Sequence, residues 1–304
     1  MAMPVIKGKK TVAERFPGAV DTFCIEAMMQ DRKAMQSATS HFMGQNFAKA
    51  FKITYLDQLE RNNYAWTTSW GCSTRLIGGL IMTHSDDNGL CLPPKLSPFH
   101  IVILPILHTK NMRSQVLQYC DMLKQELNNQ LFSGEYLRIN IDKRDLRGGE
   151  KMWQWIKKGI PLWIEVGPRD IQQNSLLIGR RDQNLKNRFR INYEIFIKKA
   201  SKILESIQDT MYQRALFFRK KHTIDINNKK DFYDFFTSLN NKESSNQGGF
   251  VSAYWCENQE IENKIKKELK ISIRCIPQEN SYQKGKCIIT GKENSKKVIF
   301  AKSY

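Results

Sequence analysis

The segment that most constrains the fold is residues 64–94, YAWTTSWGCSTRLIGGLIMTHSDDNGLCLPP. An aromatic and hydroxyl-rich run predicts a strand that ends at Gly71, and a helix opens at Ser73. Arg75 stands in the first turn of this helix, where the N-terminus already has positive partial charge. A bound anion such as a nucleotide phosphate would explain this placement, whereas an exposed Arg without a partner is the alternative. Apolar residues then follow at helical spacing: Leu76, Ile77, Leu80 and Ile81.

Length and composition limit the class of protein. The chain has 304 residues, enough for two or three domains, and it contains no apolar run of about 18 residues that would predict a membrane span. The first residues, MAMPVIKGKK, lack the apolar core of a signal peptide. Seven cysteines are scattered through the sequence, which is typical of reduced thiols in a cytoplasmic protein.

The net charge is strongly positive. Lys and Arg number 48 against 30 Asp and Glu, which gives +18 at pH 7. Such a balance indicates a polyanionic partner. The chain is also rich in Lys, Asn and Ile, so the base composition of an AT-rich genome is an alternative cause for part of the excess.

The order of predicted elements divides the chain into three regions. Residues 1 to about 95 are mixed, and LCLPPKLSP (90–98) is a stiff connector. Residues 99 to about 200 alternate strands with helices, which predicts an α/β domain with a largely parallel sheet. In the first region we expect strands near Asp21–Met29 and Tyr64–Trp70 and helices near Ser40–Phe51 and Ser73–Thr83.

The remainder contains a long helix and a small closing unit. Residues 193–220 have the apolar spacing of an amphipathic helix. The polar run NNKESSNQGG (240–249) predicts a mobile loop. Residues 250–304 predict a small α+β unit, and the chain has no internal repeats.

A group of hydroxyl residues with one histidine, QSATSH (36–41), is a candidate binding segment. If this segment is extended, Thr39 and His41 share one face and can line a pocket. The alternative is that Ser40 caps the helix bearing Phe47 and Phe51.

Four long phrases resemble the prolyl-tRNA synthetases of the archaeal/eukaryotic-like type, which are class II aminoacyl-tRNA synthetases. SWGCSTRLIGGLIMTHSDDNGLCLPPKLSP resembles the third signature motif of the family, and RFPGAVDTFCIEAMMQDRKAMQSATSHFMGQNFAKAF resembles the block before it. LRGGEKMWQWIKKGIPLWIEVGPRD resembles the anticodon-binding domain. GKCIITGKENSKKVIFAKSY resembles the closing segment.

The resemblance implies a multidomain fold of α/β and α+β type. Residues 1–96 would be the C-terminal part of a class II antiparallel-sheet catalytic domain. Residues 97–205 would be an α/β anticodon-binding domain. Residues 206–304 would be the small α+β C-terminal domain of the family.

The resemblance also implies the substrates, which are L-proline, ATP with Mg²⁺, and proline tRNA. By resemblance Gln36, Thr39, Ser73 and Arg75 contact ATP, and Arg75 is the catalytic group that stabilises charge as the proline carboxylate attacks the α-phosphorus. The residues that would contact proline are His41, Trp70 and Gly71. From composition alone, Trp70 would be a core residue. Cys72 replaces the Val or Leu that usually follows SWG in the family, which is a small apolar change.

The turn EVGPRD (165–170) ends a predicted strand, where ligands of open α/β sheets bind. By resemblance Glu165, Arg169 and Asp170 would contact the anticodon, whose unpaired bases expose their Watson–Crick edges. An ordinary ion-paired strand end is the alternative. Arg180 and Arg181 lie one predicted strand away.

Many relatives have a four-cysteine zinc site near the end of the chain. Cys256 and Cys287 match its first and third ligands, but Ile261 and Thr290 occupy the second and fourth positions. Two thiolates cannot close a tetrahedral structural site, so we expect no zinc. Cys275 is extra, and its spacing does not make it a replacement ligand.

Two motifs of class II synthetases, one forming the dimer interface and one with an Arg for the α-phosphate, are not found before residue 1. We therefore expect a C-terminal portion of about three-fifths of a synthetase, inactive alone, whose full-length form is a cytoplasmic homodimer. Three explanations are open: a gene fragment of a normal enzyme, one half of a split enzyme, and a non-catalytic tRNA-binding protein. Without the resemblance, a generic RNA-binding module would also fit.

Overall fold

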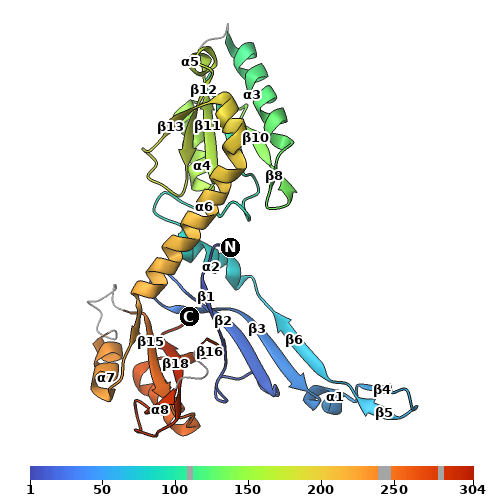
Figure 1. Cartoon of the computed structure of the whole chain (residues 1–304), viewed down its shortest axis with the longest axis vertical. Coiled ribbons are helices and arrows are strands. Elements are labelled where there is room, and N and C mark those ends of the chain that lie inside the picture. The colour runs from blue at the N-terminus through green and yellow to red at the C-terminus, as the bar shows by residue number, and fades with distance from the viewer. Residues whose placement is uncertain (108–111, 239–247, 280–283) are drawn as a thin grey trace. The chain divides into compact units, whose positions relative to one another are not determined.

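The computed structural model describes residues 1–107, 112–238, 248–279 and 284–304 (Figure 1). The chain forms two compact units. The first unit contains Met1–Met3 and Leu80–Ala215, and the second contains Pro4–Gly79 and Leu216–Tyr304. The expected loop at 240–249 lies mostly outside the described residues. In the described part of the chain, no helix has both the length and the apolar character needed to cross a bilayer.

The first unit is built on a five-stranded sheet in the order β10-β7-β11-β12-β13. The first three strands are parallel and the last two are antiparallel to their neighbours, so the expectation of a largely parallel sheet was wrong and the sheet is mixed. The connection from β11 to β12 is too short for the crossover that a parallel pair requires. The strands are β7 (Ile101–Pro105), β10 (Ile139–Ile141), β11 (Leu162–Val166), β12 (Ser175–Arg180) and β13 (Phe189–Asn192).

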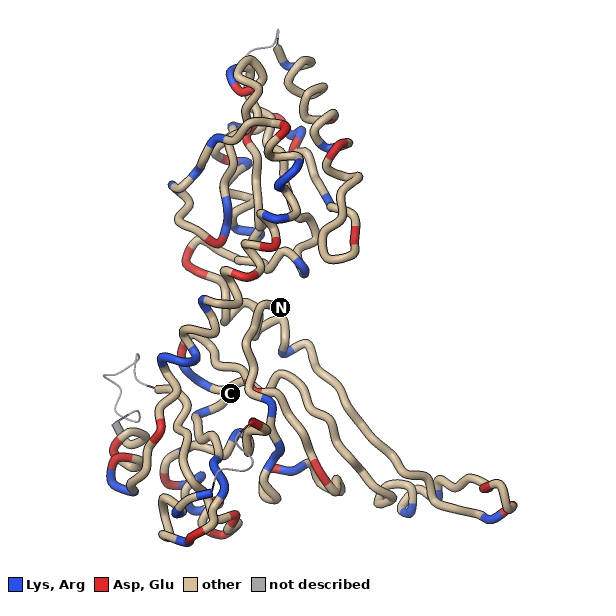
Figure 2. Tube along the Cα trace, in the orientation of Figure 1, with Lys and Arg blue, Asp and Glu red and all other residues tan. Residues whose placement is uncertain are grey.

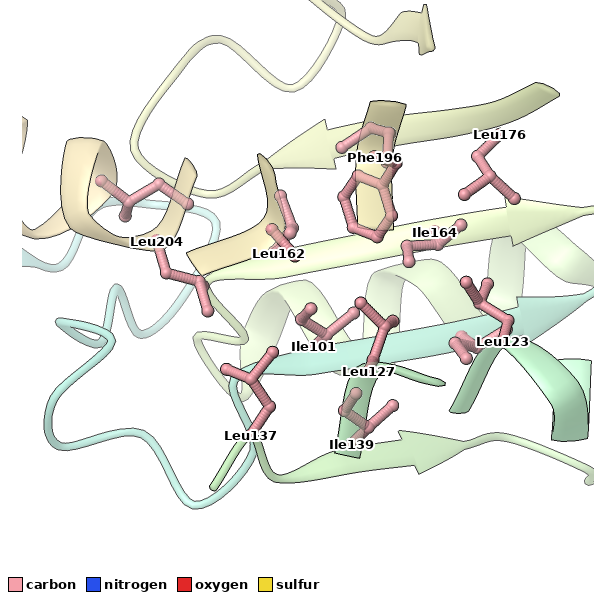
Figure 3. Packing of buried hydrophobic residues seen from close by; sticks show 14 of the residues in the cluster. Ile101, Leu123, Leu127, Leu137, Ile139, Leu162, Ile164, Leu176, Phe196 and Leu204 are labelled. Carbon is pink, nitrogen blue, oxygen red and sulfur yellow. The ribbon is translucent and has the colours of Figure 1, made fainter. Parts of the chain in front are cut away.

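Apolar side chains of this sheet and its helices form one core. Figure 3 shows Ile101 and Ile164 on neighbouring strands, with Leu127 and Phe196 packed against them from helices. The continuous apolar run IVILP explains the central position of β7, because a strand covered on both faces has no polar side. The helices of the region are α3 (Arg113–Asn128), α4 (Gly148–Lys157), α5 (Pro168–Gln172) and α6 (Tyr193–Lys221), with a small ribbon of β8 (Leu131–Phe132) and β9 (Glu135–Tyr136).

The second unit is built on a nine-stranded sheet that joins residues from both ends of the sequence. Its path is β14-β15-β18-β16-β1-β2-β3-β6, and β17 pairs with β18. The link between the early and late strands is the antiparallel pair β1–β16, in which Gly8 lies opposite Pro277. The early strands are β1 (Val5–Lys9), β2 (Asp21–Met28), β3 (Ala34–Gly44) and β6 (Thr67–Gly71), and the late strands are β14 (Thr223–Asp225), β15 (Phe250–Trp255), β16 (Ser272–Pro277), β17 (Lys284–Gly285) and β18 (Ser295–Ala301).

A buried ion cluster crosses the junction between early and late strands. Glu26 is fully buried, and its carboxylate accepts hydrogen bonds from Lys10 at 2.8 Å and from Arg274 at 3.0 and 3.1 Å. Lys10 Nζ also donates to the carbonyl of Arg274 at 2.7 Å. Because each charge has a partner, the burial cost is offset, whereas removal of one member would leave an unpaired charge in the core.

The expected helix at Ser40–Phe51 was wrong over its first half. β3 continues through His41 to Gly44, and only α1 (Asn46–Phe51) is helical. Pairing with β2 on one side and β6 on the other decides the conformation, since these tertiary hydrogen bonds outweigh local propensity. Ser40 is therefore a strand residue and caps no helix.

The expected strand at Tyr64–Trp70 is divided. Tyr64 ends a hairpin strand, and β6 begins at Thr67. Figure 1 shows the hairpin at the end of the extension made by β3 and β6. The hairpin strands are β4 (Thr54–Leu56) and β5 (Asn62–Tyr64), and the remaining helices are α2 (Arg75–His84), α7 (Lys229–Ser238) and α8 (Gln259–Leu269).

Spatial contact groups residues 4–79 with 216–304, whereas the sequence suggests boundaries near 96 and 205. The two divisions differ because one sheet joins strands from both ends of the sequence, so spatial contact and sequence order need not place the boundaries at the same residues. The three-domain division stays a prediction.

Candidate functional site

The candidate nucleotide segment of β3 places three half-buried side chains on one face of the sheet. Gln36, Thr39 and His41 lie opposite Glu26, Cys24 and Thr22 of β2, respectively. Simple alternation would put Gln36 on the other face from Thr39, but the register shifts by one residue at this point. The bulge at Ser37 thus brings all three residues to the same side, as bulges next to binding sites often do.

His41 is held by two neighbours. Its Nδ1 lies 3.0 Å from the hydroxyl of Thr22, and its ring centroid lies 4.8 Å from that of Phe16. The backbone N–H of Phe16 donates to the same Thr22 hydroxyl at 3.3 Å. This arrangement favours donation from the hydroxyl to Nδ1, which leaves the imidazole proton on Nε2 for a ligand.

Gly71 and Trp70 lie on the strand that pairs with the other side of β3. Gly71 is directly opposite Thr39, and a Cβ atom added at Gly71 would meet no atom within 4 Å. The space beside Thr39 is therefore open to a ligand. Trp70 is opposite Ser40, so its side chain lies on the other face from His41, and it is 76% exposed. The structure does not bring Trp70 and His41 together.

Arg75 begins α2, close to the helix start expected from the sequence. Ser73 accepts a hydrogen bond from the backbone N–H of Arg75 at 3.3 Å, so its hydroxyl caps the first turn. Both residues are exposed, and Arg75 has no ion pair within the described residues. A cation at a helix start with no carboxylate partner is suited to an anionic ligand.

The turn after β11 is the second candidate site. Glu165 accepts a hydrogen bond from Arg188 at 2.7 Å. Asp170 accepts from the backbone N–H of Gly167 at 2.9 Å, which closes the start of α5, and it also pairs with Arg190. Arg169 is exposed and has no ion pair within the described residues.

Sequence reasoning missed Arg188 and Arg190. Glu165, Leu177 and Arg190 are aligned across three strands, so Arg190 lies on the face that holds Glu165. The available signal was the alternation of arginine with apolar residues in NRFRI (187–191), which puts both arginines on one face of a strand. Arg180 and Arg181, by contrast, are engaged by Asp182 and Asp86, and the side chain of Arg181 is only 2% exposed.

Each Arg–carboxylate pair presents a donor beside an acceptor. The Arg188 and Arg190 side chains are 39% and 49% exposed, whereas Glu165 and Asp170 are 17% and 11% exposed, so the arginines are the accessible members of both pairs. A donor next to an acceptor is complementary to the hydrogen-bonding edge of an unpaired base. We call Glu165, Arg169, Asp170, Arg188 and Arg190 the charged strip.

Three of the four positions compared with the cysteine site lie in an apolar corner. Cys256, Ile261 and Cys287 belong to one hydrophobic cluster. Burial alone would raise the pKa of the Cys287 thiol, but hydrogen bonds from Thr290, the nearby backbone and Cys256 lower it below its usual value. Cys275 is at a different place and contacts Cys24. In the described residues no three His, Cys, Asp or Glu side chains converge as metal ligands, and these side chains do not fit a zinc ion.

Positive charge is not confined to either site. Figure 2 shows Lys and Arg distributed over both units. Such a distribution would give an extended polyanion contacts with many phosphates, which add affinity without reading sequence.

Two family models match parts of the chain. Residues 100–204 match the family model described as anticodon binding domain. Residues 240–304 match the model described as prolyl-tRNA synthetase, C-terminal.

Individual relatives match the whole chain. It is 48% identical to the proline–tRNA ligase of Bdellovibrio bacteriovorus and 48% identical to that of Protochlamydia amoebophila, over 100% of its own length and 60% of theirs. A solved structure of prolyl-tRNA synthetase from Cryptosporidium parvum, complexed with L-proline and AMP, superposes with a TM-score of 0.86 at 35% identity and covers 100% of this chain and 62% of that one. The chain thus spans about three-fifths of the length of the relatives that it matches.

Proposed function

We propose that the chain is part of a prolyl-tRNA synthetase and takes part in the ATP-dependent ligation of L-proline to proline tRNA, as its similarity to proline–tRNA ligases supports. The main support is the face formed by Gln36, Thr39 and His41 beside the open space over Gly71. The chain spans 60% of the Bdellovibrio ligase. We expect catalysis to require the portion that it does not match.

In the first step, an oxygen of the proline carboxylate attacks the α-phosphorus of ATP. The bond from that phosphorus to its bridging oxygen breaks, pyrophosphate leaves, and prolyl-adenylate forms. Gln36, Thr39 and Ser73 hold the nucleotide. Arg75 stabilises the charge that develops on the α-phosphate oxygens.

Magnesium belongs to the substrate in this proposal. Within the described residues no cluster of three or more potential ligand side chains would hold the ion on its own. Mg²⁺ bound to ATP phosphates neutralises part of their charge, and Arg75 adds a fixed cation.

The proline end of the site rests on His41 and Gly71. With its proton on Nε2, His41 offers a donor to the amino acid, while Gly71 permits close approach of a small ring. The role of Trp70 stays a prediction, since its side chain lies on the opposite face of β3 and β6.

The charged strip contacts the anticodon of proline tRNA in this proposal. Arg169 has no ion pair within the described residues and is therefore available to RNA without losing a partner. Glu165 and Asp170 accept hydrogen bonds from base edges when Arg188 and Arg190 shift toward phosphates or bases. The exposed lysines add affinity that does not depend on sequence.

We further propose that the full-length enzyme is a homodimer and acts in the cytoplasm, where proline tRNA is used. Class II resemblance supports the first statement. The second follows from the substrate.

The test is proline-dependent exchange between ATP and pyrophosphate. The chain is assayed alone and after fusion to the remaining part of the Bdellovibrio ligase, which we call the joined enzyme. We expect exchange from the joined enzyme and none from the chain alone. Robust exchange by the chain alone would contradict the need for the missing portion. A folded joined enzyme that binds proline tRNA without exchange would favour the non-catalytic tRNA-binding alternative.

A further inference from the structure

We propose that helix α8 holds the loop between β1 and β2 over His41, so that Glu262 and Lys266 are positioning residues for the proline end of the site. The loop comprises residues 10–20. This inference rests on the proposed function for its substrate, but the contacts that support it are independent of any ligand.

Two side chains on one face of α8 contact the loop. Thr11 donates its hydroxyl hydrogen to Glu262 at 2.8 Å, and both residues are buried. Lys266 donates to Glu14 at 2.6 Å. Positions 262 and 266 are one helical turn apart, so α8 presents an acceptor and a donor to successive parts of the loop.

The same loop contacts His41 through Phe16. The Phe16 ring lies 4.8 Å from the His41 ring, and its backbone N–H bonds the Thr22 hydroxyl that contacts His41 Nδ1 at 3.0 Å. A displacement of Phe16 would therefore alter both the packing of the imidazole and its hydrogen bond. Since Phe16 is two residues from Glu14, movement at the Lys266 contact reaches His41 over a short length of chain.

The far end of the loop is fixed from another element. Asn46 donates to the carbonyl of Gly18 at 2.9 Å, and the Phe47 ring occupies the space where a side chain at position 18 would project. Gly18 has a φ of +84°, which favours glycine. With Gly18 fixed by α1, α8 controls the remaining freedom of the segment from Thr11 to Phe16.

Attachment of the late strands does not depend on these contacts. The cluster of Lys10, Glu26 and Arg274 already joins β1, β2 and β16 in the core. The Lys266–Glu14 pair is partly exposed, with 53% of the Lys266 side chain accessible, and such pairs add at most about 1 kcal/mol to stability. Loss of this pair should free the loop while the fold remains.

The first experiment measures His41 in this chain by ¹⁵N NMR of labelled histidines, with its signals assigned by His41→Gln. Lys266→Ala should shift the His41 ring nitrogens and speed amide exchange in residues 11–18 by about fivefold or more. Lys264→Ala is the matched control, because Lys264 is 71% exposed and, among the residues that the structure describes, its ion pair is with Glu268 of the same helix. The double variant Glu14→Lys with Lys266→Glu should restore the original signals.

An unchanged His41 signal and unchanged loop exchange in Lys266→Ala would overturn the proposal. So would equal changes in Lys264→Ala, because the ion pair of that residue is with Glu268 of α8 and not with the loop. Circular dichroism of both variants checks that the fold persists. If Lys266→Ala unfolds the chain, Glu14→Gln removes the same ion pair by changing the residue of the loop.

The second experiment concerns the substrate. In the joined enzyme, Lys266→Ala should raise the KM for proline about three- to tenfold and leave kcat and the KM for ATP within twofold. A change in His41 without a change in the KM for proline would refute the role in the proline site. If the unmutated joined enzyme gives no exchange, the proposed function fails, while the NMR result still decides whether α8 positions the loop.

Discussion

The sheet site of β3, β6 and α2 and the charged strip of the first unit use charge in opposite ways. Arg75 has no carboxylate partner within the described residues, and the space over Gly71 is open. In the strip, Glu165 and Asp170 already hold Arg188 and Arg190. An unpaired cation gains a full new interaction when an anion arrives, whereas a paired group must first give up its partner. The first arrangement suits stabilisation of developing charge, and the second suits discrimination between similar ligands.

The largest expected effect tests the unpaired side of this comparison. In the joined enzyme, Arg75→Ala should lower proline-dependent exchange by about 100-fold or more, on the scale of losing one donor to the transition state. Arg61→Ala is the control, since Arg61 is an exposed residue of the β4–β5 hairpin that pairs with Asp57. If Arg75→Ala retains near-normal exchange while Arg61→Ala is also normal, Arg75 does not act on ATP and the contrast between the two sites disappears.

A smaller effect is expected in the strip. Arg169→Ala should weaken binding of proline tRNA by about 1–3 kcal/mol at about 150 mM salt and affect a tRNA with another anticodon much less. Competition binding measures both affinities. The control Lys186→Ala, an exposed neighbour, should weaken both tRNAs slightly and equally. Equal losses from Arg169→Ala would make it a phosphate or structural residue, and absence of any preference in the unmutated chain would mean that discrimination needs the missing portion.

A fall in pH should weaken the paired charges of the first unit, because it protonates their carboxylates, and this loss should appear as a lower melting temperature. Hydrogen bonds from Arg144 lower the pKa of Asp142 to about 2, despite the opposing effect of burial, and Trp155 also donates to it. Because the folded pKa lies below the unfolded value, this carboxylate stabilises the fold above about pH 4, and the contribution is lost as the pH falls toward 2. Asp142→Asn should therefore lower the melting temperature at pH 6 and have little effect near pH 2. A constant difference across this range would show that the carboxylate charge is not responsible.

The last prediction is that the chain binds no zinc, so that removal of zinc has no effect on its stability. Elemental analysis should find well under one zinc per chain, and chelators should leave the melting temperature unchanged, because Ile261 and Thr290 stand where two ligands would be needed. The double variant Ile261→Cys with Thr290→Cys should bind zinc, and chelators should then lower its melting temperature. One zinc per unmutated chain would contradict the prediction and would mean that the molecule has a metal site in addition to the two charged sites compared above.

The sequence was most informative where local pattern and tertiary environment agree. The sequence predicts β7 and β11 from their continuous apolar runs, because strands buried on both faces have no polar side. It predicts α3 and α6 from apolar residues at helical spacing, because one stripe of each helix is buried. The apolar pattern also predicted where β11 ends and, to within about two residues, where α2 begins. The antiparallel direction of β12 could have been predicted from the short link between β11 and β12, which leaves no room for a crossover.

Register and long-range pairing were not predictable from residue order. The hydroxyl-rich β3 has no strong local period, so its strand character comes from β2 and β6. The face occupied by Trp70 depends on the same register. Arg188 and Arg190 lie 23 and 20 residues from the carboxylates that they contact, and no local spacing connects them.

The pairing of β1 with β16 has a consequence for synthesis. Lys10 and Arg274, which meet at this junction, are separated by 264 positions. At about 5–20 residues per second, a ribosome needs on the order of 13 to 50 s to make the intervening chain. During that interval β1 has an unpaired edge, which is the kind of surface that recruits strands from other chains. The nine-stranded sheet therefore cannot be completed until β16 has been made, and a nascent chain stalled before β16 would be a substrate for chaperones or proteases.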